Sequence, residues 1–156
     1  MPRRILLLGT HLTALAIGFA LGIYALPILT APPSPDKAAL RSASSGSLFK
    51  ARFERNLKGS DLFHWGEGEV RIMRDKIVHD GRLAPGPDYK LYLAPDFVDT
   101  KEGFLKIKAQ SRIIGDVKTF NGAIVAVPPG VDVERYTTVV IWCEAFSQFI
   151  SAAKYR

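Results

Sequence analysis

The pattern of hydrophobic and polar positions divides the chain into an apolar N-terminal run and a longer region of alternating character. From Ile5 to Leu29 there are 25 consecutive residues without Asp, Glu, Lys or Arg. A helix of that length reaches about 37 Å, more than the roughly 30 Å of a bilayer's hydrocarbon core. Residues 5–29 are therefore predicted to form one transmembrane signal-anchor helix.

The charges that flank this run predict its orientation. Arg3 and Arg4 precede it, whereas residues 27–32 carry no charge. Because basic flanks stay inside, we expect residues 1–4 in the cytoplasm and the remainder in the periplasm or outside the cell, anchored in the inner (cytoplasmic) membrane. A cleaved signal peptide is the alternative, but its apolar region is usually only about 7–15 residues long.

Gly18 and Gly22 form a G-x-x-x-G spacing inside the anchor. Small residues at this spacing let two membrane helices approach closely, which predicts a homodimer. The alternative is that these glycines have no such role, because glycine is common in membrane helices in general.

The stretch 30–46 is rich in Pro, Ser and Ala and poor in large apolar residues. Such a composition is typical of a linker, within which a short helix around residues 35–41 is compatible with the pattern. The linker separates the anchor from residues 47–156, which are enough for one compact domain.

Within 47–156 the pattern favours strands. Short runs alternate between apolar and polar residues or are rich in Val, Ile, Tyr and Phe, and turn sequences such as Asp80-Gly81 lie between them. Asn121-Gly122 between two apolar runs predicts a two-residue hairpin. The predicted fold is all-β, an antiparallel β-sandwich of about seven to eight short strands. Candidate strands are 67–74, 88–93, 103–109, 116–120, 123–127, 137–143 and 146–152.

Composition narrows the function classes. The net charge is +6, but the basic residues are scattered and no nucleic-acid recognition motif is present, so we do not expect a nucleic-acid partner. The chain also lacks a nucleophile elbow, a Ser/Lys pair and an H-E-x-x-H sequence. Whether it is an enzyme stays open, since no standard catalytic site is visible and a redox carrier is the most the residues suggest.

Cys143 is the only cysteine, which excludes an intramolecular disulfide. It ends an apolar run from Val139, where a buried inert thiol is common. A redox or ligand role and an intermolecular disulfide are the alternatives. Together with His64 it could bind a prosthetic group, including noncovalent haem, but the spacings typical of zinc sites and covalent haem are missing.

The sequence V-V-I-W-C from Val139 to Cys143, followed by F-S-x-x-F from Phe146 to Phe149, resembles the end of the DM-thirteen domain. This domain is the electron-transfer module of Skeletor-type proteins and of many small membrane-anchored bacterial proteins. Further marks appear in order, and the resemblance covers about residues 46–156. They are His64 with Gly66 and Gly68, Gly86-Pro87-Asp88, Gly115, Pro128, Tyr136 and Ala152-Ala153.

The resemblance implies a sandwich similar in style to cytochrome-binding DOMON modules, with Cys143 as redox thiol or prosthetic-group ligand, His64 as its helper, and a redox partner in the cell envelope. It further implies structural roles for Gly86, Pro87, Asp88 and Trp142. Lys90 stands where the family often has His, which removes a second iron ligand. Two hypotheses follow: a tethered electron-transfer module, or a noncatalytic binding or structural module with Cys143 buried and inert.

Overall fold

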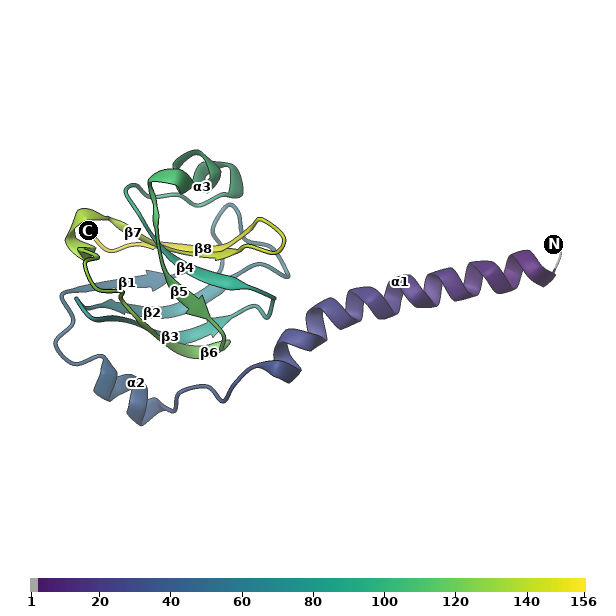
Figure 1. Cartoon of the computed structure of the whole chain (residues 1–156), viewed down its shortest axis with the longest axis horizontal. Coiled ribbons are helices and arrows are strands. Elements are labelled where there is room, and N and C mark those ends of the chain that lie inside the picture. The colour runs from purple at the N-terminus through teal and green to yellow at the C-terminus, as the bar shows by residue number, and fades with distance from the viewer. Residues whose placement is uncertain (1–2) are drawn as a thin grey trace.

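The computed structural model describes residues 3–156, in which a long N-terminal helix precedes a two-layered β domain (Figure 1). Helix α1 (Arg3–Thr30) has no buried residue and extends away from the domain. Its length and composition would allow it to cross a membrane. Of the predicted cytoplasmic segment 1–4, residues 1 and 2 lie outside the described residues.

The domain consists of two four-stranded antiparallel sheets, which confirms the predicted all-β sandwich. The first sheet has the order β1-β2-β3-β6, with β1 (Phe49–Phe53), β2 (Gly66–Ile72), β3 (Lys76–Leu83) and β6 (Asn121–Ala126). The second has the order β5-β4-β7-β8, with β5 (Arg112–Val117), β4 (Tyr89–Ala94), β7 (Thr138–Cys143) and β8 (Gln148–Lys154).

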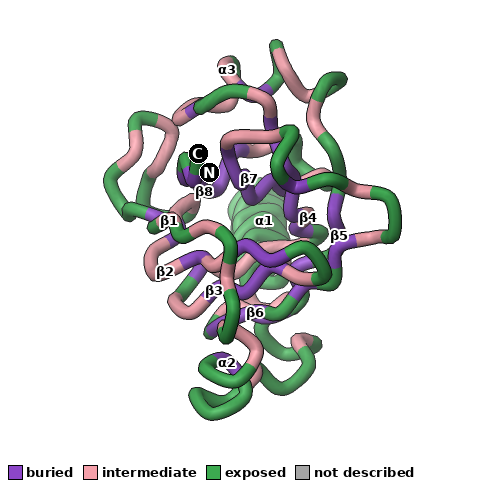
Figure 2. The backbone as a smooth tube through the Cα atoms, turned by 90° about the vertical axis from the view of Figure 1, so that its left-hand side faces the viewer, coloured by how far each residue is buried: buried purple, intermediate pink, exposed green. Residues whose placement is uncertain are grey.

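The two faces of the second sheet pack into different clusters because successive side chains on a strand point to opposite faces. In β7, Val139, Ile141 and Cys143 join the core between the sheets. Val140 and Trp142 point outward into a second cluster, which helix α3 (Lys101–Ile107) covers through its own apolar side chains. All six residues of β7 are therefore buried, and Figure 2 shows burial concentrated in the strands.

A short helix, α2 (Lys37–Ala43), lies within the stretch predicted as a linker. Asp36 caps its first turn by accepting a hydrogen bond from the Ala39 amide at 2.7 Å. Leu40 packs with Met73 and Val78 on the outer face of the first sheet. Part of the predicted linker is therefore held against the domain. Two short 3-10 turns, Lys108–Gln110 and Val133–Arg135, complete the fold.

The predicted strand 103–109 is wrong, because these residues begin in α3. Thr100 caps the helix by accepting a hydrogen bond from the Gly103 amide at 3.1 Å, and Glu102 adds a negative charge to the first turn. Phe104 and Ile107 are three residues apart and both pack against the outer cluster. The apolar residues whose spacing suggested an alternating strand therefore lie on one face of a helix.

Two turn predictions are also wrong. Asn121-Gly122 begins β6 and makes no hairpin, since β5 and β6 belong to different sheets. Asp80-Gly81 lies inside β3, where the register with β6 shifts between His79 and Arg82. The strand predicted at 116–120 lies earlier, as β5, and strands β1 and β3 were not predicted at all.

The alternating strand directions gather four connections at one end of the sandwich. These are the last part of the β1–β2 connection (61–65) and the connections 84–88, 118–120 and 144–147. The C-terminal end of α1 lies at this same end (Figure 1). The start of β1 and the β2–β3 turn lie at the opposite end, where the Leu48 amide bonds the Ile72 carbonyl at 2.9 Å.

Candidate functional site

Cys143 is the last residue of β7, at the end of the sandwich that faces α1. It pairs with Tyr89 of β4 on one side and with Gln148 of β8 on the other. The side chain points into the core between the sheets, and the residue is only 3% exposed. Two flanking strands and the inner core therefore fix its position.

The Cys143 thiol has specific polar neighbours. Its Sγ donates a hydrogen bond to the Pro87 carbonyl oxygen at 3.0 Å. Burial raises the pKa of the thiol above its usual value, and the charges of Asp88 and Glu144 act in the same direction, while backbone amides at the following turn only partly offset them. The sulfur is therefore a neutral thiol near pH 7, unlike the thiolate of a nucleophilic cysteine.

The Gly86-Pro87-Asp88 turn is fitted closely to its surroundings. A Cβ on Gly86 would lie 2.4 Å from the Tyr89 hydroxyl oxygen, and Asp88 adopts a left-handed conformation with φ of 51°. The Asp88 carbonyl accepts the Glu144 amide at 3.0 Å. Lys90 bonds Asp88 and Asp116, each at 2.8 Å. This turn thus places the Pro87 carbonyl over the thiol.

His64 is oriented by a neighbouring carboxylate. Its Nδ1 lies 2.9 and 2.8 Å from the two carboxylate oxygens of Asp61. Burial, the largest single influence, opposes ionisation of Asp61, but hydrogen bonds from His64 and from the Phe63 amide together outweigh it and lower the pKa of that carboxyl. With Nδ1 donating to Asp61, Nε2 of a neutral His64 is the proton acceptor.

Cys143 and His64 line the same small cavity of about 90 Å³. The structure thus brings together the two residues singled out from the sequence, although Cys143 ends β7 and His64 lies in the β1–β2 connection. Helix α1 contributes Ile23 and Tyr24 to the walls. The remaining lining residues are mostly apolar: Phe63, Pro85, Gly86, Pro87, Tyr89, Phe146 and Ile150.

The cavity beside Cys143 is too small for a haem. Ligand pockets for drug-sized molecules typically measure about 300–1,000 Å³, several times the volume beside Cys143. Lys90 is engaged by Asp88 and Asp116 and is no iron ligand. Among residues 3–156 no group of three or more His, Cys, Asp and Glu side chains could hold a metal ion.

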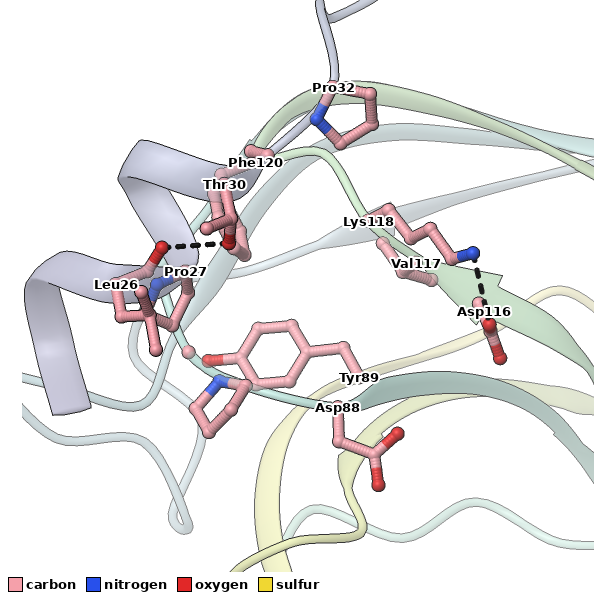
Figure 3. Close-up of a pocket in the computed structure, with 13 residues that line it drawn as sticks. Leu26, Pro27, Thr30, Pro32, Asp88, Tyr89, Asp116, Val117, Lys118 and Phe120 are labelled. Carbon is pink, nitrogen blue, oxygen red and sulfur yellow. Dashed lines mark hydrogen bonds and ion pairs between the residues drawn. The ribbon is translucent and has the colours of Figure 1, made fainter.

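A larger groove of about 340 Å³ adjoins the cavity, between the end of α1 and the domain. Leu26, Pro27 and Thr30 form its helix side, and Tyr89 and Phe120 line it from the domain (Figure 3). Asp116 and Lys118 form an ion pair at 3.5 Å beside it. The environment of the Cys143 turn thus includes both the domain and the N-terminal helix.

Trp142 lies on the opposite face of β7 from the thiol. Its ring packs 5.0 Å from that of Phe104, between centroids, and the Lys108 amine lies 5.4 Å over it. Lys108 also pairs with Glu144 at 2.7 Å, and the same carboxylate accepts a hydrogen bond from Tyr92. Trp142 therefore belongs to the cluster under α3 and does not line the Cys143 cavity.

A family model described as electron transfer DM13 matches residues 52–155. The chain belongs to the DM13 family. No curated protein and no solved structure gave a match. The DM13 match confirms the resemblance inferred from the closing motif. It includes every cavity residue of the domain but not Ile23 and Tyr24, which the N-terminal helix adds.

Proposed function

We propose that this DM13 chain is an electron-transfer domain tethered to the outer face of the cytoplasmic membrane, with Cys143 as its redox-active or ligand-binding group. The observation that carries the proposal is the shared cavity of Cys143 and His64 within a domain of this family. The apolar helix α1, which begins with Arg3 and Arg4, supports the tether and its orientation.

Oxidation of the sulfur and its use as a ligand both require the thiol to lose its proton. The raised pKa of Cys143 makes this loss unfavourable without a base. His64 lines the same cavity. Because the proton of neutral His64 lies on Nδ1, which bonds Asp61, Nε2 carries no proton and can accept one. We assign His64 the role of accepting the proton, with the Asp61 carboxylate stabilising the imidazolium that forms.

The burial of Cys143 favours a second candidate, a noncatalytic tethered binding or structural module. A residue that is 3% exposed and carries a neutral thiol matches the environment of an inert core cysteine. In that case the Cys143–Pro87 hydrogen bond serves only to fix the turn.

Redox titration of the purified full chain in lipid nanodiscs separates the two candidates. Absorption spectra and electrochemical potentials would be recorded for wild type, Cys143→Ser, His64→Gln and, as a matched histidine control, His79→Gln. An electron-transfer role predicts a reversible couple that Cys143→Ser abolishes. His64→Gln, but not His79→Gln, should raise its potential, because the proton that the thiol loses on oxidation then has no acceptor in the cavity. A folded wild type without a redox couple would support the inert module.

A further inference from the structure

Three large apolar side chains project from the end of the domain that faces α1. Leu62 is 75% exposed, Phe63 57% and Phe146 53%. They come from two separate connections, 61–65 and 144–147, that the fold brings to this end. We call these three residues the apolar tip. Clustered exposed apolar side chains of this size are typical of interaction surfaces.

The length of α1 gives the depth at which the tip would lie. Ile5 to Tyr24 are 20 residues, which reach about 30 Å and match the hydrocarbon core of a bilayer. Tyr24 would then stand at the membrane–water boundary, where tyrosine is enriched. The Phe63 ring packs edge-on against Tyr24 with 6.1 Å between centroids, which places Phe63 at the same depth.

The helix residues beyond Tyr24 extend the same apolar surface. Leu26 is 60% exposed and Leu29 is 80% exposed, and both follow Tyr24 within the apolar run 5–29. Leu26 lines the groove against the domain, which Asp88, Asp116 and Lys118 also line. A surface in which apolar side chains lie beside charged groups is suited to the boundary of a bilayer leaflet, where acyl chains give way to headgroups.

We propose that the apolar tip is embedded in the interfacial region of the outer leaflet beside α1. This inference rests on the proposed membrane tether. The lipid surface is favoured over a second copy of the chain because the tip contacts α1 at the residue that marks the boundary. Phe63 and Phe146 also line the Cys143 cavity, so the cavity faces the bilayer surface and not bulk water.

Spin labelling of the full chain in nanodiscs of phosphatidylcholine and phosphatidylglycerol tests the embedding. In a Cys143→Ser background, single cysteines would carry the label at Phe63, at Phe146, and at Leu48 as control. Leu48 is an exposed apolar residue at the opposite end of the sandwich. We expect several-fold lower accessibility to a water-soluble nickel complex at Phe63 and Phe146 than at Leu48, with oxygen accessibility kept high.

Two results would overturn the proposal. Nickel accessibility at Phe63 and Phe146 equal to that at Leu48 would place the tip in water. Low accessibility to both nickel and oxygen would indicate burial against protein, as in a dimer. A label at Leu15, in the middle of α1, separates these failures from failure of the tether, since a water-accessible Leu15 would contradict the membrane-spanning helix itself.

A tryptophan substitution keeps the test independent of cysteine labels and of the Cys143→Ser change. Phe146→Trp retains an aromatic side chain, and Leu48→Trp is its control. Quenching by brominated lipids should be stronger for Phe146→Trp, after subtraction of the signal of Trp65 and Trp142 in the parent chain. Equal quenching in the two variants would contradict embedding.

Discussion

The thiol of Cys143 donates a hydrogen bond to the carbonyl oxygen of Pro87 at 3.0 Å. Next to this bond, the Glu144 amide donates to the Asp88 carbonyl, so the end of β7 is joined twice to the turn that precedes β4. The turn and the thiol are thus one structural unit at the end of the sandwich that faces α1. This arrangement holds the sulfur in its protonated form, as a donor.

The first prediction concerns alkylation of Cys143. Because burial raises its pKa above the ordinary value of 9.0, the native thiol should react with iodoacetamide far more slowly than the urea-unfolded chain at pH 7. The native rate should still be increasing with pH above pH 9, where the rate of the unfolded chain levels off. Mass spectrometry of timed samples measures both rates. A native rate at pH 7 equal to the unfolded rate would contradict the protonated, buried thiol.

Much of the sandwich could be predicted because its strands have one face toward the core and one toward solvent. The runs at β2 and β6 show this directly, whereas β4 and β7 could be recognised as short apolar runs and are buried on both faces. Strand β3 was not predicted because Asp80-Gly81 resembles a turn sequence. In the structure, Gly81 instead allows β3 to approach β2 closely. The α3 helix was missed because Thr100, the cap that starts it, precedes the alternating residues.

The candidate site was predictable in part. Cys143 and His64 could be named from residue type and motif, but their convergence depends on which connections meet at one end of the sandwich. The Asp61–His64 pair was missed although its three-residue spacing is a local signal. The contribution of Tyr24 could not be predicted, since it depends on how α1 leaves the domain.

The second prediction concerns the close approach of β2 and β3 at Gly68. This residue has a φ of +118°, and a Cβ there would lie 2.4 Å from the Gly81 Cα. Gly68→Ala should destabilise the domain by about 2–4 kcal/mol, through backbone strain and displacement of β3. Urea unfolding measures the change. Gly46→Ala is a control with a φ of +74° and open space around it, and it should cost less.

The third prediction concerns the polar cluster under α3. Glu144 accepts hydrogen bonds from Tyr92 and from Lys108, and burial together with the Glu144 bond raises the pKa of Tyr92. Tyr92→Phe should lower the free energy of unfolding by about 1.5–3 kcal/mol, because a hydrogen bond to a charged group is lost. Tyr136→Phe, on a partly buried ring elsewhere, is the control. An effect no larger than that of the control would contradict the assigned bond.

The fourth prediction concerns the pH dependence of stability through His79. This residue is 3% exposed, its ring packs on Phe53, and its Nε2 donates to the Glu67 carbonyl at 2.9 Å. Burial lowers the pKa of His79 below its ordinary 6.5, and the Glu67 bond and the Asp80 charge only partly compensate. The folded chain therefore keeps His79 neutral where the unfolded chain already binds a proton.

Because the unfolded state binds more protons below pH 6.5, stability should fall as the pH decreases from 7 to 5, with a slope of at most about 1.4 kcal/mol per pH unit from this group. Urea unfolding of wild type and His79→Gln at several pH values measures the slope. The variant should be less stable at pH 7, but its free energy of unfolding should change less between pH 7 and 5 than that of the wild type. Asp61 and Glu144, with their lowered pKa values, titrate below this window, so an unchanged slope in His79→Gln would contradict the neutral buried histidine.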